Sequence, residues 1–198
     1  MSPWPWAKVE WRAVCAERCT YGSGRGSAYA LPTPLWTAEG WLYVAAVIDL
    51  FSRRVVGWSM SSSMTAQLVA DALVTAIWRR GKPDALLHHS DRGSQYTSEP
   101  FQRLMADHGV ACSMSRSGNC WERAIEGAMG PSPMASAAME SFFSSLKIER
   151  VARKVYRTRD QAKADVFDYI ERFYNPRRRH STLGYLSPVE FEKKMLLA

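Results

Sequence analysis

One carboxylate, Asp91, stands where a short apolar run ends. Residues 85–87 lead into His88 and His89, and the breaker Gly93 follows the acid by two positions. Buried strands of open α/β sheets place functional side chains at their carboxyl ends, because the strand is rigid and the loop beyond it leaves room for a ligand. Asp91 is therefore a candidate functional residue. The alternative interpretation is that its side chain only caps a turn.

Such an acid takes part in phosphodiester chemistry when it meets other acids around divalent cations. Two metal ions about 3.5–4 Å apart polarise a phosphate and stabilise the attacking and leaving oxygens. Carboxylates suit magnesium because it is a hard cation. Acids on a central strand, at the end of a neighbouring strand and on a late helix would converge in this way, and Asp91 and Glu140 fit two of these places. His88 and His89 are interpreted as structural, because nothing nearby completes a metal set.

The elements that would position these acids are predicted from periodicity and turn chemistry. Thr65 is the expected N-cap of the first helix. In chain order, the pattern predicts a hairpin of strands at 41–49 and 54–59, a helix at 66–80, a strand ending near 89, a helix at 98–108, a strand at 110–114, and helices at 138–150 and 159–174. This order indicates an α/β fold, with a mixed sheet and helices on both of its faces.

Two stretches lack such a pattern. Residues 1–29 show neither a helical nor an alternating period, and we interpret this amino end as a disordered or loosely attached arm. The stretch 125–137 contains Gly-Pro-Ser-Pro, which cannot be a helix interior. It is interpreted as a flexible excursion.

The composition limits the class of protein. The chain has 198 residues, of which 46% are hydrophobic, and this suits one globular domain with appendages. Lys and Arg number 26 against 19 Asp and Glu, so the net charge is +7. This excess favours a polyanionic partner. The four cysteines form no C-x-x-C pair and no zinc-ligand spacing, so thiols in a reducing compartment are expected.

The sequence carries no signal for a membrane. The longest apolar run, 42–48, is too short to span a bilayer. The amino end lacks the charged start, long apolar stretch and cleavage site of a signal peptide. A cytoplasmic protein without a membrane partner is therefore expected.

Six ordered segments carry a family resemblance. They are 37–43, 47–58, 89–98 (His-Ser-Asp-Arg-Gly-Ser-Gln-Tyr-Thr-Ser), 118–121, 139–147 (Met-Glu-Ser-Phe-Phe-Ser-Ser-Leu-Lys) and 174–188, which contains Arg-Arg-His-Ser-Thr-Leu-Gly-Tyr. They resemble the catalytic core of insertion-sequence transposases related to retroviral integrases. The resemblance implies a ribonuclease-H-like fold and an Asp-Asp-Glu triad that holds two Mg2+ (or Mn2+) ions. It also implies cleavage and transfer of DNA strands, with transposon ends and target DNA as partners, and association into a homo-oligomer.

The resemblance also implies roles for individual residues. Asp91 would be the second acid of the triad and Glu140 the third, as catalytic residues and metal ligands. Lys147 matches the basic residue that lies two turns after the family's Glu and would contact DNA. The alternative for Lys147 is an ion pair with an acid one helical turn away.

A basic run follows the last predicted helix. Since Arg and Lys bind phosphates without regard to sequence, this run is a candidate for DNA contact. Its members are Arg177, Arg178, Arg179 and His180.

The chain departs from the family pattern at the first acid. Counting back without a gap from the Ala-Glu-Gly-Trp turn at 38–41 puts the first acid on Leu31. Two neighbouring prolines also argue against a central strand here, since each removes a hydrogen-bond donor. The nearest other acids are Asp49 and Glu39, and Asp49 belongs to a different family motif.

The interval between the second and third acids also differs. Asp91 and Glu140 are separated by 48 residues. Deleting 125–137 restores the family's interval of about 35, and loops tolerate such an insertion because closure entropy rises slowly with length. Glu126 is an alternative third acid.

Residues 37–192 are therefore expected to form an integrase-like core with an insert at 125–137 and a basic tail, preceded by a divergent arm at 1–36. We expect catalysis to be impaired, because Leu31 cannot bind a cation. The alternative is a non-catalytic, degenerate remnant that retains nucleic-acid binding, which would also suit a frameshifted gene.

Overall fold

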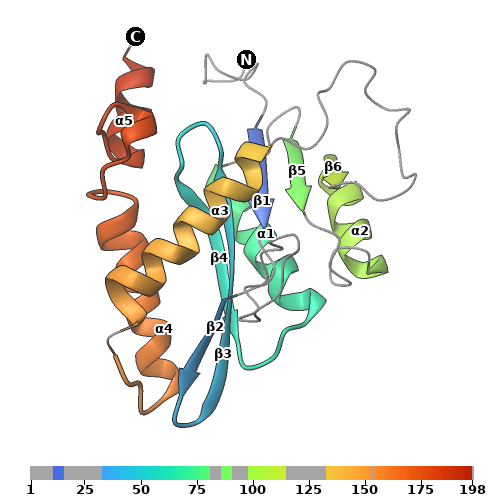
Figure 1. Cartoon of the computed structure of the whole chain (residues 1–198). Coiled ribbons are helices and arrows are strands. Elements are labelled where there is room, and N and C mark those ends of the chain that lie inside the picture. The colour runs from blue at the N-terminus through green and yellow to red at the C-terminus, as the bar shows by residue number, and fades with distance from the viewer. Residues whose placement is uncertain are drawn as a thin grey trace.

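A six-stranded mixed sheet forms the centre of the computed structural model, which describes residues 11–15, 33–80, 86–90, 98–114, 133–152 and 154–197. Its strands are β1 (Trp11–Cys15), β2 (Thr33–Thr37), β3 (Gly40–Asp49), β4 (Val55–Ser61), β5 (Leu86–Ser90) and β6 (Val110–Met114). β3 pairs antiparallel with β4 along one edge and with β2 and β1 along the other, while β1, β5 and β6 run parallel. Figure 1 shows the long β2–β3 hairpin below the short strands β1 and β5. The predicted hairpin of β3 and β4 is confirmed.

β1 and β2 share one edge of β3, although 17 residues lie between them in the chain. Thr33 pairs with Val44 and Cys15 pairs with Val47, so the two strands follow one another along β3. The residues Trp11–Cys15 lie in the stretch where no regular element was expected, and for them that prediction is wrong. The other residues of the unpatterned stretch 1–29, namely 1–10 and 16–29, lie outside the described residues, whereas 33–36 of the expected arm 1–36 belong to β2.

β2 is consistent with the interpretation that the prolines argue against a central strand. Pro34 lies inside β2 and pairs with Tyr43. Among the described strands, β2 pairs with β3 alone. A proline is tolerated there because an edge strand does not need all of its N–H donors.

Helices cover both faces of the sheet. They are α1 (Ala66–Arg80), α2 (Glu99–Asp107), α3 (Pro133–Leu146) with a π-helical turn (Lys147–Val151), α4 (Arg159–Asp168) with a second π-helical turn (Tyr169–Tyr174), a short 3-10 turn (Ser181–Leu183) and α5 (Pro188–Leu196). α1 has the predicted bounds, and the Thr65 hydroxyl accepts the Leu68 N–H at 3.3 Å as the expected N-cap. α3 begins five residues earlier than predicted. For residues 133–137 the interpretation as a flexible excursion is wrong, because they form the first part of α3. Pro133 is tolerated at the start of the helix, where the missing N–H costs no hydrogen bond.

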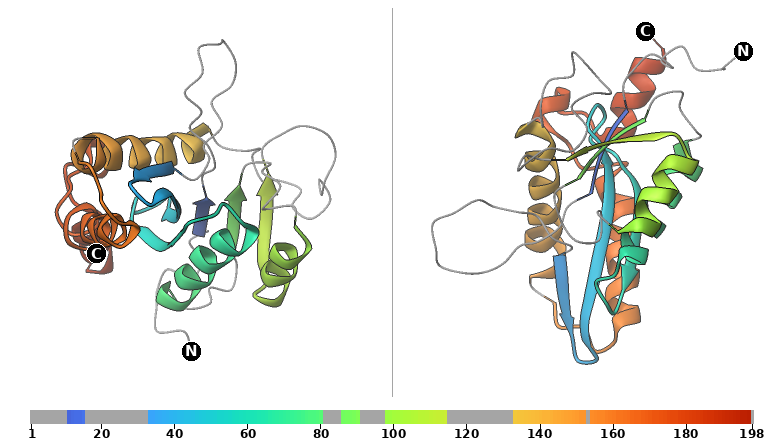
Figure 2. Two further views of the ribbon diagram at one scale, coloured as in Figure 1. Left: turned by 90° about the horizontal axis from the view of Figure 1, so that it is seen from below. Right: turned by 90° about the vertical axis from the view of Figure 1, so that its right-hand side faces the viewer.

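The alternation of β3 divides the apolar residues into two cores. Val44, Ala46 and Ile48 pack with α3 and α4 on one face. Ala45 and Val47 pack with α1 and α2 on the other. Figure 2, in its left view, shows these helix pairs on opposite sides of the strands. The predicted mixed sheet with helices on both faces is confirmed.

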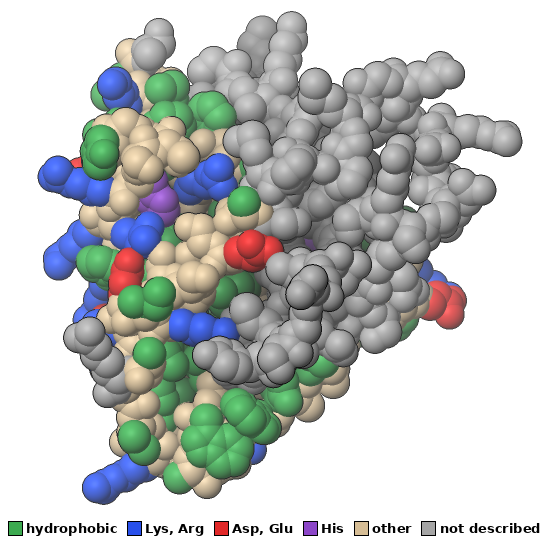
Figure 3. All heavy atoms as spheres, in the orientation of Figure 1, with side chains coloured by type: hydrophobic (Ala, Val, Ile, Leu, Met, Phe, Trp, Pro, Cys, Tyr) green, Lys and Arg blue, Asp and Glu red, His purple; other side chains and the backbone are tan. Residues whose placement is uncertain are grey.

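The C-terminal segment, residues 175–197, ends in a helix that was not predicted from the sequence. α5 starts with a capping box, in which the Ser187 hydroxyl accepts the Glu190 N–H and the Glu190 carboxylate accepts the Ser187 N–H. The signal for it is the spacing Ser-Pro-x-Glu at 187–190. Lys and Arg side chains gather over the C-terminal elements on the face seen in Figure 3. None of the described helices is long and apolar enough to cross a membrane.

Candidate functional site

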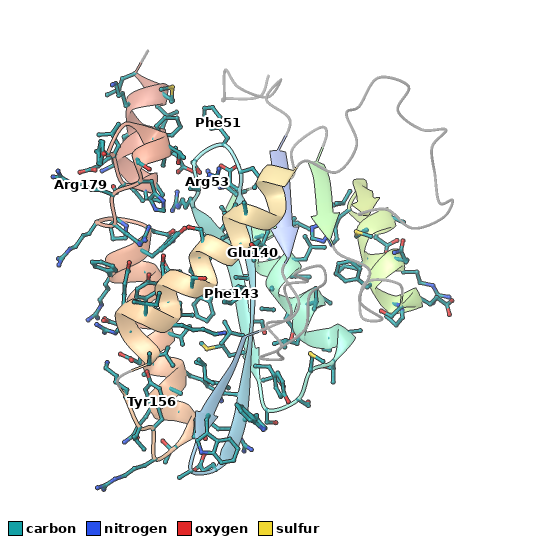
Figure 4. All side chains as sticks on the ribbon, viewed as in Figure 1. Phe51, Arg53, Glu140, Phe143, Tyr156 and Arg179 are labelled. Carbon is teal, nitrogen blue, oxygen red and sulfur yellow. The ribbon has the colours of Figure 1, made fainter. Side chains whose placement is uncertain are left out.

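The candidate acids are carried by two neighbours of the central strand β1. β5 runs parallel to β1 and ends at Ser90, opposite Cys15. Asp91 follows Ser90 in the chain and lies outside the described residues. α3 packs against β1 as well, and Figure 4 shows Glu140 midway along α3, level with the carboxyl end of β1. The helix of one candidate acid and the strand end that leads to the other therefore flank the same strand.

The register assigns positions on these strands to the two faces. Ile48 of β3 packs on the face of the sheet that α3 covers, and Val14 of β1 pairs with it. His89 of β5 in turn pairs with Val14. His88 belongs to the other face, where its buried ring lies 5.7 Å from the ring of Phe101. The structural interpretation of His88 is consistent with this position.

The strands β1 and β2, which pair along the same edge of β3, contain no candidate for the first acid of the triad. Neither Trp11–Cys15 nor Thr33–Thr37 contains Asp or Glu. Leu31, where the family count puts the first acid, lies outside the described residues, as does the alternative third acid Glu126.

Asp49, one substitute considered for the first acid, lies on the face of the sheet that α3 does not cover. Its neighbour Val47 packs against α1, and Asp49 is 2% exposed at the end of β3. Its carboxylate accepts the Phe51 N–H at 3.1 Å and the Ser52 hydroxyl at 2.6 Å. Burial raises the pKa of Asp49, while Ser52 and Arg80 act in the opposite direction. Asp49 therefore fixes the β3–β4 turn and lies on the opposite side of the sheet from α3.

Glu39, the other substitute, lies at the tip of the β2–β3 hairpin. Its carboxylate accepts the backbone N–H of Arg159 at 2.9 Å, at the first residue of α4. An acid at this place stabilises the positive end of a helix. Glu39 is therefore a helix-capping residue in this structure.

An ion cluster that sequence reasoning missed surrounds Asp49. We call it the Arg80 cluster, and it consists of Asp49, Ser52, Arg54, Arg80 and Glu192. Arg80 lies 3.4 Å from Asp49 and contacts Glu192, which also pairs with Arg54 at 2.7 Å. Burial alone would raise the pKa of Glu192, but Arg80 and Arg54 hold it below its usual value. No local pattern signals this cluster, because its members come from β3, the β3–β4 turn, α1 and α5.

The basic candidates differ in how they are held. Lys147 is half-buried and makes no ion pair in the part of the chain that the structure describes. Arg177 and Arg179 are exposed. Arg178 donates to the Ser145 hydroxyl at 2.7 Å and pairs with Glu149 at 3.1 Å, so it ties the basic run to α3.

His180 is packed into the protein and carries no charge at neutral pH. Its ring meets the Tyr174 ring edge to face at 5.2 Å. Burial, together with the charges of Arg178 and Arg53, lowers the pKa of His180 to about 4. The cationic part of the predicted basic run is therefore limited to its three arginines.

We expect His180 to make folding stability depend on pH. Since its pKa falls on folding, its contribution is present above pH 6.5 and is lost as the pH falls toward 4. Urea titrations of wild type and His180→Gln should show the difference between their unfolding free energies change by about 1–2 kcal/mol across this range, once solvent screening of the half-buried ring is allowed for. A difference that stays constant with pH would contradict this role.

Comparison with known proteins identifies similar sequences and folds. Residues 30–120 match a family model described as integrase core domain, and residues 140–196 match a second model with the same description. The chain is 46% identical over 181 residues to transposase InsF for insertion sequence IS3A from Escherichia coli (strain K12). This alignment covers 91% of this chain and 58% of that protein. It is 43% identical over 157 residues to the transposase for insertion sequence element IS904 from Lactococcus lactis subsp. lactis (strain IL1403), with 79% and 57% covered. The chain thus spans less than three fifths of these curated relatives.

A solved structure supports the fold. The crystal structure of the catalytic core domain of BIV integrase matches with a TM-score of 0.59 at 15% identity, and the match covers 94% of this chain and 96% of that one. The ribonuclease-H-like fold that the resemblance implied is confirmed by this match.

Proposed function

Because the chain belongs to the integrase core family, we propose that it is the core of an insertion-sequence transposase that acts on DNA, with its strand cleavage and transfer impaired. The observation that carries this proposal is the arrangement around β1, where α3 with Glu140 and the end of β5 before Asp91 flank one strand. Asp91 and Glu140 would then act as the second and third acids of the triad. Their roles are carried over from the family pattern.

The residues present fit a divalent metal only in part. Asp91 and Glu140 would supply two hard oxygen ligands, and a bound Mg2+ or Mn2+ ion would polarise a phosphodiester. Among the described residues, no group of three His, Cys, Asp or Glu side chains could hold a metal ion. The family count puts the remaining ligand of the triad on Leu31, whose side chain has no oxygen to bind a cation.

The residue at the position of the first acid supports impairment. The family count puts that acid on Leu31, whose side chain carries no oxygen. A metal ion held by Asp91 and Glu140 would therefore lack one carboxylate ligand.

The charge distribution supports DNA as the partner. Arg177 and Arg179 are exposed on the C-terminal segment, and Lys147 is unpaired among the described residues of the same protein. Together with the net charge of +7, they suit sequence-independent contact with phosphates. Self-association into a homo-oligomer stays a prediction of the family resemblance, which sedimentation velocity would measure.

The proposal is tested by measuring binding and chemistry on the same DNA. We expect labelled duplex to bind with an affinity that falls steeply with salt. Strand-transfer product with Mg2+ or Mn2+ should be at least about 100-fold below that of the IS3A relative on its own end sequence, since even an outer-shell partner of a metal is worth roughly 10–100-fold. Asp91→Ala and Glu140→Gln should leave the metal-free DNA affinity unchanged. Efficient joining that Asp91→Ala abolishes would contradict impairment, and absence of DNA binding would contradict the whole proposal.

A second candidate is a non-catalytic remnant that only binds DNA. The lack of Asp and Glu in Trp11–Cys15 and Thr33–Thr37 favours it. It predicts a DNA affinity that neither Mg2+ nor Asp91→Ala changes, and no strand nicking at all. Weak nicking that requires the metal would favour the impaired transposase core.

A further inference from the structure

Two residues in the described ranges other than glycine have a positive φ. They are Arg53, with φ 60°, and Tyr185, with φ 61°. L side chains rarely adopt this conformation, and such strain persists where the surroundings impose it, often at functional sites. Arg and Tyr are also the side-chain types that bind phosphates and stack on bases.

The backbone of Arg53 is fixed by buried groups. Asp49 accepts the Phe51 N–H at 3.1 Å and the Ser52 hydroxyl at 2.6 Å, and its own N–H donates to the Arg54 carbonyl at 2.9 Å. Asp49 and Ser52 are both fully buried. The β3–β4 turn is therefore over-determined, and it imposes the strained conformation on the residue at its tip.

Arg53 is half-buried, and its guanidinium forms no hydrogen bond or ion pair within the part of the chain that is described. It acts electrostatically on Tyr174 and His180, which places it beside the C-terminal segment. Figure 4 shows Arg53 at the β3–β4 turn next to that segment, and Arg179 farther out on it.

Tyr185 is held beside the same histidine by its backbone. Its N–H donates to the His180 carbonyl at 2.9 Å, and the His180 N–H donates to the Leu186 carbonyl at 3.1 Å. The preceding Gly184 also has a positive φ, of 65°. The Tyr185 side chain is 70% exposed, so a fixed loop presents an aromatic ring to solvent.

We propose that Arg53 and Tyr185 form a DNA-contact site beside His180, in which Arg53 binds a phosphodiester and Tyr185 stacks on an unpaired base. The site rests on the proposed function, because it requires that the chain binds DNA, and it adds that the bound strand is locally single-stranded. Stacking on a side chain needs a base that has left its own stack. His180 is neutral, so the site takes its positive charge from Arg53 and the neighbouring arginines.

The test uses the full chain with a labelled single strand and its duplex, and measures fluorescence anisotropy over a range of salt concentrations. Arg53→Gly should weaken binding and lower the magnitude of the salt slope for the single strand by about 0.7, the value for one phosphate. The same variant should resist urea better than wild type, because glycine adopts a positive φ without strain. Arg53→Gln should lose the same affinity without that gain in stability. If Arg53→Gly is more stable than wild type but binds DNA more weakly, the weaker binding cannot come from unfolding, and Arg53 contacts the DNA.

Tyr185→Ala should weaken single-strand binding about 5- to 150-fold, the range for loss of one stacked base, and should weaken duplex binding less. Tyr185→Phe keeps the ring and should bind as wild type does. Arg103→Gln removes the same charge from exposed α2, on the opposite face of the sheet, and should leave the affinity unchanged.

Each outcome decides between the two proposals. Weaker binding in both the Arg53 and the Tyr185→Ala variants, with both controls unaffected, supports the site. If wild type binds DNA and either Arg53→Gln or Tyr185→Ala binds equally well, the site is overturned while the proposed function stands. If wild type binds no DNA, the proposed function fails and the site fails with it.

Discussion

Replacing Arg80 with methionine is expected to lower the free energy of unfolding by about 3 kcal/mol, the lower end of the range for breaking a buried ion pair. Arg80 lies between Asp49, whose side chain is 1% exposed, and Glu192, whose side chain is 14% exposed. Without the guanidinium, both carboxylates stay desolvated and repel each other. Urea unfolding at pH 7, followed by circular dichroism, measures the loss.

The pH dependence of this loss identifies its cause. Because the pKa of Asp49 is raised on folding, its contribution to stability is present at low pH and is lost as the pH rises through that value. In the variant, Glu192 also loses the cation that lowers its pKa, so it too becomes protonated at a higher pH. The deficit should therefore shrink as the pH falls from 7 toward 4.

Arg79→Met is the matched control on the same helix. Its ion pair with Glu171 joins side chains that are 39% and 26% exposed, so we expect a loss of about 1 kcal/mol or less. A deficit of Arg80→Met that matches this control, or that stays constant with pH, would mean that Arg80 does not neutralise the two buried acids.

Local signals in the sequence were sufficient for the elements that form from their own residues. β3 is rich in β-forming residues and α1 has a 3.6-residue period with Thr65 as its cap. The bounds of α1 are as predicted, and β3 begins one residue before its predicted start. The strand Trp11–Cys15 has no such signal. It is a strand because β3 and β5 offer backbone partners on both of its sides, and those partners come from distant parts of the chain.

The candidate site divides in the same way. The placement of Glu140 on a helix that packs against the sheet followed from the apolar periodicity of residues 138–150, and the structure has it there. The basic run was recognised as a run of charges inside a family segment, and neither signal predicts how each side chain is held. That Arg178 is bound by Ser145 and Glu149 depends on how α3 meets the C-terminal segment, which no local pattern encodes. The predicted meeting of Asp91 with Glu140 stays a prediction, because Asp91 lies outside the described residues.

Replacing Asn175 with alanine is expected to cost about 2–4 kcal/mol, because two buried backbone groups lose their partner. The Asn175 amide accepts the Val55 N–H at 2.9 Å and donates to the Val55 carbonyl at 3.0 Å. Both residues are buried. The side chain thus takes the place that a neighbouring strand would have beside the first residue of β4. Thermal and urea unfolding measure the loss. The control is Thr158→Ala, which removes the N-cap of α4 and should cost about 1 kcal/mol.

The loss of Asn175 should also weaken DNA binding below the unfolding temperature. Asn175 directly precedes the segment with Arg177 and Arg179, and its carbonyl accepts the Val189 N–H at 3.1 Å at the start of α5. Without the two hydrogen bonds to Val55, the chain at residue 175 is no longer held against β4, and the exposed arginines are less well ordered. DNA binding must then offset the entropy cost of ordering them. An affinity equal to that of wild type in Asn175→Ala would mean that the position of the basic run does not depend on this contact.

Asn175→Asp distinguishes loss of the hydrogen bonds from loss of packing. At neutral pH the carboxylate can still accept the Val55 N–H, but it has no proton for the Val55 carbonyl and brings a charge into a buried place. Burial should raise the pKa of this carboxyl, so at low pH it becomes protonated, and its O–H can then donate to the Val55 carbonyl. The deficit of Asn175→Asp should therefore shrink as the pH falls, while that of Asn175→Ala stays constant. If both deficits respond to pH in the same way, the two hydrogen bonds to Val55 are not what anchors the C-terminal segment to the sheet.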